Sequence, residues 1–387
     1  MRALPQRGAA AAVETASHSQ TIQDDAGTIV TKETTVSKMT AVEKWRLNVL
    51  VPRGIEIVKE PVHQLALDHF GYFGTDKHQC QEWVLKRLQS GENEDAVFLR
   101  GGHDFTTNIA EQYTEMVARG LCEEEFATFA KTRLLMTPDF RPIAGKDTVW
   151  KAERAIQLYT HADADSLWAP PPLLSGEEYG GKDFNLRPDC AYWLSIQSFS
   201  KNNRGLVGKA TFTVRKRIAT PYLTIEFKKS ETTVEQAINQ AIAASSLALF
   251  NRFRLKEHRL RASKKNWNRK HFDQILHYMM TFTGPSASIW VVRLKSSSAS
   301  DDFSKVAWDG CEAVKLWECD CESAEDVGDL VDYINTIHRW GLMHGAYCKR
   351  DVKAVLLTKG GMIADRVSDL FAAGDSIEDG EDEEGVG

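Results

Sequence analysis

Apolar and polar residues alternate most clearly over residues 221–228. Successive side chains of an extended strand point to opposite faces. Leu223, Ile225 and Phe227 are therefore expected on one face, with Glu226 and Lys228 on the other. The pattern predicts a strand that carries a carboxylate and an ammonium group two residues apart.

Similar patterns organise the rest of the chain. Alternation predicts further extended segments at 190–200, 210–214, 287–294, 315–319 and 353–357. Apolar residues at helical spacing predict helices at 60–73, 79–88, 107–118, 123–135, 149–159 and 326–340, and a further helix is predicted at 271–280. Thr232-Thr233-Val234-Glu235 has the spacing of a capping box and predicts the start of a long helix that reaches about Arg254. This mixture indicates an α/β (α+β) protein with a central sheet flanked by helices and a helical N-terminal region.

Composition divides the chain into four parts. Residues 1–40 are rich in Ala, Thr, Ser and Gln, which is typical of a disordered arm. A helical N-terminal subdomain is expected at 41–145 and the main domain at 146–372. Residues 373–387 form an acidic tail that we expect to be disordered. Without its seven acids, the formal net charge of -6 becomes about +1, so the body of the chain is nearly neutral.

The cellular setting is also constrained. Seven cysteines, an odd number, do not suggest a disulfide framework. No stretch approaches the roughly 18–20 apolar residues that span a bilayer, and the N-terminus lacks a secretory signal pattern. We therefore expect no membrane association and no secretion, with the nucleus or cytoplasm as the location.

Two short motifs carry a resemblance to a known family. Pro188-Asp189 lies at the edge of one predicted strand, and Glu226-Phe227-Lys228 lies on another. The chain thus resembles the PD-(D/E)XK nuclease superfamily over residues 145–300. It also looks like the nuclease-like domains of uncharacterised fungal families, some of which accompany mobile or selfish genetic elements. The resemblance implies a restriction-endonuclease-like core with a central mixed sheet.

The resemblance further implies metal-dependent hydrolysis of phosphodiester bonds. By analogy, Asp189 and Glu226 would hold Mg²⁺, with Mn²⁺ as a substitute, and the carbonyl of Phe227 would complete the shell. Lys228 would lie against the attacking water or the scissile phosphate. Glu153, on the helix predicted at 149–159, and Gln240, on the long helix, are the further catalytic candidates. For each of these two, an ordinary exposed polar residue is the equally simple interpretation.

A basic segment follows the long helix and indicates a nucleic-acid partner, with DNA as the expected form. Its members would neutralise phosphates together with Lys229, and the candidates are Arg252, Arg259, Arg261, Lys264 and Lys265. A solvated helix end is the plainer interpretation of the same charges. The principal hypothesis is a Mg²⁺-dependent deoxyribonuclease. The alternative is a catalytically inactive nuclease-like scaffold that binds nucleic acid or a protein.

Overall fold

The alternating segment around Glu226 forms part of β5 (Ile218–Lys228), an inner strand of a mixed sheet. The computed structural model describes residues 40–60, 97–137, 151–174, 184, 186–229, 233–295 and 306–359. The sheet has eight strands in the order β1-β8-β7-β6-β5-β3-β2, and β4 pairs with β5 beside this path. Besides β5, its strands are β1 (Ile55–Val58), β2 (Ala152–Ile156), β3 (Cys190–Ser195), β4 (Thr213–Val214), β6 (Leu276–Thr283), β7 (Ser286–Leu294) and β8 (Cys311–Asp320).

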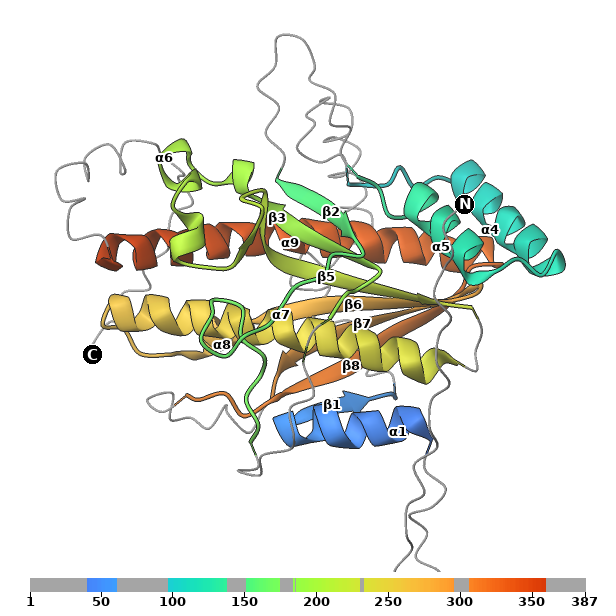
Figure 1. Cartoon of the computed structure of the whole chain (residues 1–387). Helices are drawn as coiled ribbons and strands as arrows, with labels where there is room; N and C mark the ends of the chain where they lie inside the picture. Colours follow the sequence, from blue (N-terminus) through green and yellow to red (C-terminus); the bar gives the residue numbers. More distant parts are fainter. Residues whose placement is uncertain are drawn as a thin grey trace, which may run out of the picture.

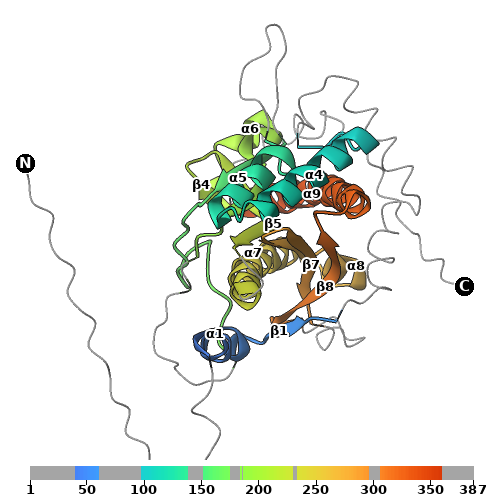
Figure 2. The same cartoon turned by 90° about the vertical axis from the view of Figure 1, so that its right-hand side faces the viewer.

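Helices cover both faces of this sheet (Figures 1 and 2). The α-helices are α1 (Ala41–Trp45), α4 (His103–Ala118), α5 (Glu123–Arg133), α6 (Lys201–Arg204), α7 (Val234–Ala262), α8 (Arg269–Asp273) and α9 (Ala324–Lys359). The short helical segments η2 (Arg46–Leu50), η3 (Val51–Arg53), η5 (Ile196–Ser198) and η6 (Val207–Lys209) connect them. The chain is therefore an α+β protein with a mixed sheet flanked by helices and an N-terminal helical region, as the sequence predicts.

The direction of α7 fixes which residues can share a site. Strands β5 and β6 are parallel, with Lys228 opposite Thr283, and α7 connects them. A connection between parallel neighbours must return the chain to the edge where the first strand began. The N-terminus of α7 thus lies near the Lys228 end of β5. Its C-terminus and α8 lie at the other end of the sheet, as Figure 1 shows.

The two faces of β5 are buried against different helices. Ile225 and Phe227 pack in a core with residues of α4, α5 and α9, whereas the opposite face of the sheet packs against α7. Because side chains alternate along a strand, Glu226 belongs to the face that α7 covers. The apolar side of the predicted alternation therefore anchors the strand, and this anchoring holds Glu226 in a buried position.

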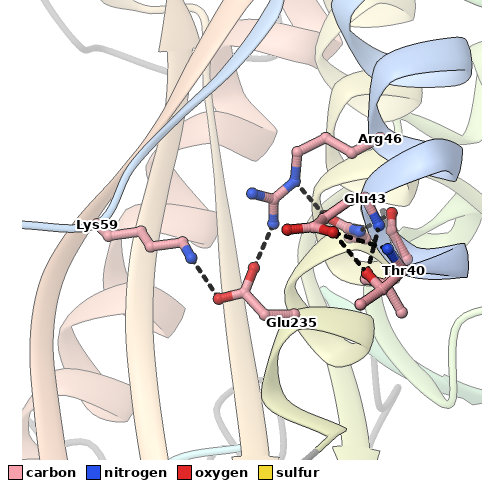
Figure 3. A network of polar contacts seen from close by, with 7 residues as sticks. Thr40, Glu43, Arg46, Lys59 and Glu235 are labelled. Atoms are coloured by element: carbon pink, nitrogen blue, oxygen red, sulfur yellow. Dashed lines mark hydrogen bonds and ion pairs between the residues drawn. The ribbon is translucent and has the colours of Figure 1, made fainter. Parts of the chain in front are cut away.

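An ionic network connects the N-terminal region to α7. Figure 3 shows Glu235 between Arg46 and Lys59, with the Glu235 carboxylate 2.5 Å from Arg46 Nη2. Arg46 Nε also donates to Asn239 Oδ1 at 2.9 Å. Glu235 is thus engaged by residues far away in the sequence. Thr232, the first residue of the predicted capping box, lies outside the described residues. A capping box is present at Thr40 and Glu43, at the start of α1.

Three local predictions are wrong. Residues 271–280 were predicted as a helix, but α8 ends at Asp273 and β6 begins at Leu276. Residues 149–159 were predicted as a helix, but the structure has β2 there, paired with β3 along its whole length. Residues 353–357 were predicted as a strand but belong to α9. The predicted arm at 1–40, the helices at 60–73 and 79–88 and the acidic tail at 373–387 lie outside the described residues, apart from positions 40 and 60. Among the described residues, no helix is long and apolar enough to cross a membrane.

Candidate functional site

The ends of β3 and β5 bring the two predicted carboxylates together. These strands are antiparallel, and Cys190 pairs with Ile225, so Asp189 comes beside the last residues of β5. The Phe227 backbone N–H donates to Asp189 Oδ2 at 3.0 Å, and Lys228 Nζ lies 3.9 Å from the same oxygen. The backbone of one strand thereby orients the carboxylate of the other.

Glu226 is the buried member of this group, with 4% of its surface exposed. Burial raises the pKa of its carboxyl group well above the usual value, and the neighbouring Asp189 carboxylate raises this pKa further. Lys228 acts in the opposite direction, but its effect is smaller. Ionising two carboxyl groups that lie close together in a poorly solvated place costs free energy, because burial and their mutual repulsion both disfavour the charged forms. The two groups either retain a proton or require a cation.

Lys228 contacts both strands and a helix. Its Nζ donates to the Phe227 carbonyl at 2.6 Å and lies 3.6 Å from Glu123 Oε1, at the first residue of α5. The Phe227 carbonyl, which was predicted as a metal ligand, is therefore a hydrogen-bond acceptor of Lys228. A carbonyl oxygen has two lone pairs, so this bond leaves one of them.

Helix α5 contributes two residues that the sequence analysis missed. Glu123 contacts Lys228 as described, and Lys131 Nζ lies 5.1 Å from the centre of the Phe227 ring. The acidic start of α5, at residues 123–125, is typical of a helix N-terminus in any protein. Sequence therefore offered no signal that this turn lies against a strand about a hundred residues further along.

Glu153 lies outside this group, which corrects its predicted position. It is on β2 instead of a helix, opposite Trp193 in the β2–β3 pairing. Only 2% of it is exposed, and its carboxylate accepts a hydrogen bond from Ser195 Oγ at 2.6 Å and pairs with Arg217 Nε at 2.7 Å. These contacts give Glu153 a structural role at the opposite end of β3 from Asp189.

Gln240 lies on α7, the helix that covers the Glu226 face of the sheet. Its Oε1 is buried and has no hydrogen-bond partner among the described residues. A buried acceptor without a donor is energetically costly. Its predicted role at the site remains a prediction, because no contact connects Gln240 to Asp189 or Glu226.

The predicted nucleic-acid surface is divided between two ends of the molecule. Lys229 is exposed directly beyond Lys228, whereas the basic segment lies at the C-terminal end of α7. At 1.5 Å per residue, Arg252 is about 27 Å along the helix from Val234. Arg252 is also only 3% exposed and lies 2.6 Å from Asp351, so it cannot contact a nucleic acid at the surface. Arg261, Lys264 and Lys265 are exposed.

The donor set of the strand-end group is compatible with a hard divalent cation. Among the described residues, no group of three or more His, Cys, Asp or Glu is arranged to hold a metal. Mg²⁺, however, binds proteins through one or two carboxylates and keeps several waters. Asp189 and Glu226 fit that requirement, and a cation would relieve the repulsion that raises the Glu226 pKa. Cys190 is fully buried, and burial raises its pKa to about 12, so a thiolate is not available there.

Comparison with known proteins gives one match. The family model described as "Domain of unknown function (DUF7924)" matches residues 173–301. The matched segment includes Asp189, Glu226 and Lys228, together with α7 and the basic residues after it. No curated protein and no solved structure matches the chain.

Proposed function

We propose that this protein is a metal-dependent nuclease that hydrolyses phosphodiester bonds of nucleic acid, with DNA as its substrate. The observation that carries the proposal is the convergence of Asp189, Glu226 and Lys228 at the ends of two adjacent strands. Two close carboxylates, one of them with a raised pKa, provide a place for a divalent cation. A lysine beside them provides a positive group for a phosphate.

In this proposal, Asp189 and Glu226 hold Mg²⁺, which supplies Lewis-acid activation of water and neutralises charge on the phosphate. The Phe227 N–H fixes the orientation of the Asp189 carboxylate by its 3.0 Å hydrogen bond. The ammonium group of Lys228 donates to a phosphate oxygen and stabilises the negative charge that develops there. Partial burial strengthens this interaction because fewer waters compete for the ammonium group.

A second candidate function is a nuclease-like scaffold without catalytic activity. Lys228 favours it, because its ammonium group already donates to Phe227 O at 2.6 Å and faces Glu123 at 3.6 Å. A lysine held by these partners must exchange at least one of them before it contacts a phosphate. A scaffold requires no such exchange.

A cleavage assay distinguishes the two functions. Plasmid and single-stranded DNA are incubated with the protein in Mg²⁺, Mn²⁺ or EDTA, and Mn²⁺ binding is measured separately by electron paramagnetic resonance. Glu226→Gln removes the buried charge with almost no change in shape. We expect Mg²⁺-dependent cutting, reduced at least about a hundredfold in this variant because several kcal/mol of electrostatic stabilisation is lost. Mn²⁺ binding should weaken in parallel.

Glu115→Gln is the matched control, because Glu115 is an exposed α4 carboxylate paired with Arg119. It should cut as the unaltered protein does. If no metal supports cutting although DNA is bound, the scaffold is the correct function. If Glu226→Gln cuts normally, the site assignment is wrong.

A further inference from the structure

A second charged cluster lies at the other end of the sheet, between α7 and α9. Asp351 of α9 is surrounded by three cations from successive turns of α7. Its carboxylate lies 2.6 Å from Arg252 Nη1, 3.2 Å from Lys256 Nζ and 3.4 Å from Arg259 Nη1. Arg252 is 3% exposed and Lys256 1%. One buried carboxylate therefore faces three basic groups.

The hydrogen bonds of this cluster are incomplete. Lys256 donates to Asp351 Oδ1 and to Gln274 Oε1 at 3.1 Å. By contrast, none of the three guanidinium nitrogens of Arg252 has a hydrogen-bond partner among the described residues, despite the close approach to Asp351. Buried charged donors without acceptors are costly and rare. The cluster thus has both positive charge and donors that its own carboxylate does not satisfy.

The cluster reaches the surface at Arg259, whose side chain is 22% exposed. His271 of α8 is half-buried there, and its Nδ1 has no hydrogen-bond partner among the described residues. Burial and the neighbouring Lys256 and Arg259 lower the pKa of His271 to about 4. Burial and Arg252 likewise lower the pKa of Lys256 to about 7. Burial is the larger cause of both pKa shifts, and the neighbouring cations add to it, so a bound anion would favour the protonated forms of Lys256 and His271.

We propose that Arg259 and His271 form the opening of a binding site for a phosphate-type oxyanion, with Lys256, Arg252 and Asp351 behind them. Guanidinium groups match the geometry of phosphate oxygens and bind them through paired hydrogen bonds. A dianion would balance the charge of the cluster more completely than chloride does. The site lies at the opposite end of α7 from Glu226, so it is independent of the proposed nuclease function.

Inorganic phosphate is the probe that tests this site in the full chain. Calorimetric titration and thermal unfolding are measured in phosphate and in sodium chloride of equal ionic strength. A ligand that binds only the folded protein raises its melting temperature. We expect phosphate to raise this temperature more than chloride does. In Arg259→Gln, phosphate affinity should fall about tenfold or more, because a charge-assisted hydrogen bond is lost.

Arg261→Gln is the matched control, since Arg261 is exposed and pairs with Glu257 on the same helix face. It should bind phosphate as the unaltered protein does. His271→Gln provides a second test that leaves the buried cluster intact, and it should also weaken binding. Equal effects of phosphate and chloride, or equal phosphate affinity in Arg259→Gln and Arg261→Gln, would overturn the proposal.

Competition identifies the source of the oxyanion. A short oligonucleotide with a 5′-phosphate is compared with the same oligonucleotide ending in a 5′-hydroxyl. Displacement of phosphate by the first alone supports a site for a nucleic-acid end. Binding of phosphate without displacement by either supports a site for a small free phosphate.

Discussion

The packing of α9 on β5 can be tested by three glycines of one helix. A Cβ at Gly341 would lie 2.5 Å, 2.7 Å and 2.8 Å from atoms of the Tyr222 ring. Real contacts of this kind are near 3.5–4.0 Å. Tyr222 belongs to β5, the strand that carries Glu226, and its hydroxyl lies 2.9 Å from His338 Nδ1 of α9. The ring therefore cannot move away without breaking a buried contact.

Replacing glycine by alanine should change the free energy of unfolding in opposite directions at Gly328 and Gly341. Replacing a mid-helix glycine by alanine contributes about 0.5–1 kcal/mol of stability where the space is open. A Cβ at Gly328 meets only Thr106 Cγ2, at 3.9 Å, so Gly328→Ala should stabilise the protein by that amount. Overpacking costs typically 1–3 kcal/mol. Gly341→Ala should therefore destabilise the protein by about 1–2 kcal/mol, once the stability gained from alanine's higher helix propensity is subtracted from the cost of overpacking.

Urea unfolding followed by circular dichroism measures both free energies. Gly345→Ala should fall between the other two variants, because its nearest neighbour is the flexible end of Leu194 at 3.1 Å. In a Tyr222→Leu background, the cost of Gly341→Ala should decrease, and the double-mutant cycle isolates that coupling. If Gly341→Ala is as stable as Gly328→Ala, α9 does not approach β5 as described.

The remaining predictions concern the cluster around Asp351. Asp351→Asn should destabilise the protein by about 3–5 kcal/mol in urea unfolding, since it leaves Arg252 and Lys256 as buried cations without a counter-charge. An Asn variant as stable as the unaltered chain would show that the carboxylate is not needed. The pKa of Lys256 is lowered from 10.5 to about 7, so the unfolded chain binds more protons between those values. The Lys256 contribution to the free energy of unfolding should thus rise with pH from about 7 to about 10. The charged groups that face Lys256 are Arg252, Arg259 and Asp351, and the titratable groups His271, His344 and Cys348 lie near it. Lys256→Met should remove this slope.

Alternation along the chain predicted β5 although both of its faces are buried, because Thr224, Glu226 and Lys228 on one face are polar and the residues between them are apolar. The same reasoning failed for β2. Its apolar residues are spaced compatibly with a helix, and what makes it a strand is its pairing with β3, more than thirty residues away. Local spacing contains no information about such a partner, so tertiary pairing overrode the pattern.

In the candidate site, too, local sequence pattern predicted some residues, whereas tertiary packing determined the others. Asp189 and Glu226 could be identified because each lies at a recognisable place on a predicted strand, and the structure brings them together. The contact of Glu123 with Lys228 depends on how α5 packs, which no local pattern encodes. The basic segment was predicted to be a nucleic-acid-binding surface because its positive charges were considered without the negative charges that pair with them in the fold. Its counter-charge, Asp351, lies nearly a hundred residues further on and buries Arg252.

The separation of the two charged groups determines how their functions can be examined. At 1.5 Å per residue, Arg259 lies about 37 Å along α7 from Val234, which is at the Glu226 end of the helix. Interactions between charges across that distance are largely screened at physiological salt, where the Debye length is about 8 Å. Variants at Asp189 or Glu226 should therefore leave phosphate binding at Arg259 unchanged. An effect of one end on the other could then arise through the packed helices and strands between them or through a ligand long enough to contact both. A nucleic acid is such a ligand, so coupling that needs DNA would connect the proposed nuclease site to the phosphate site.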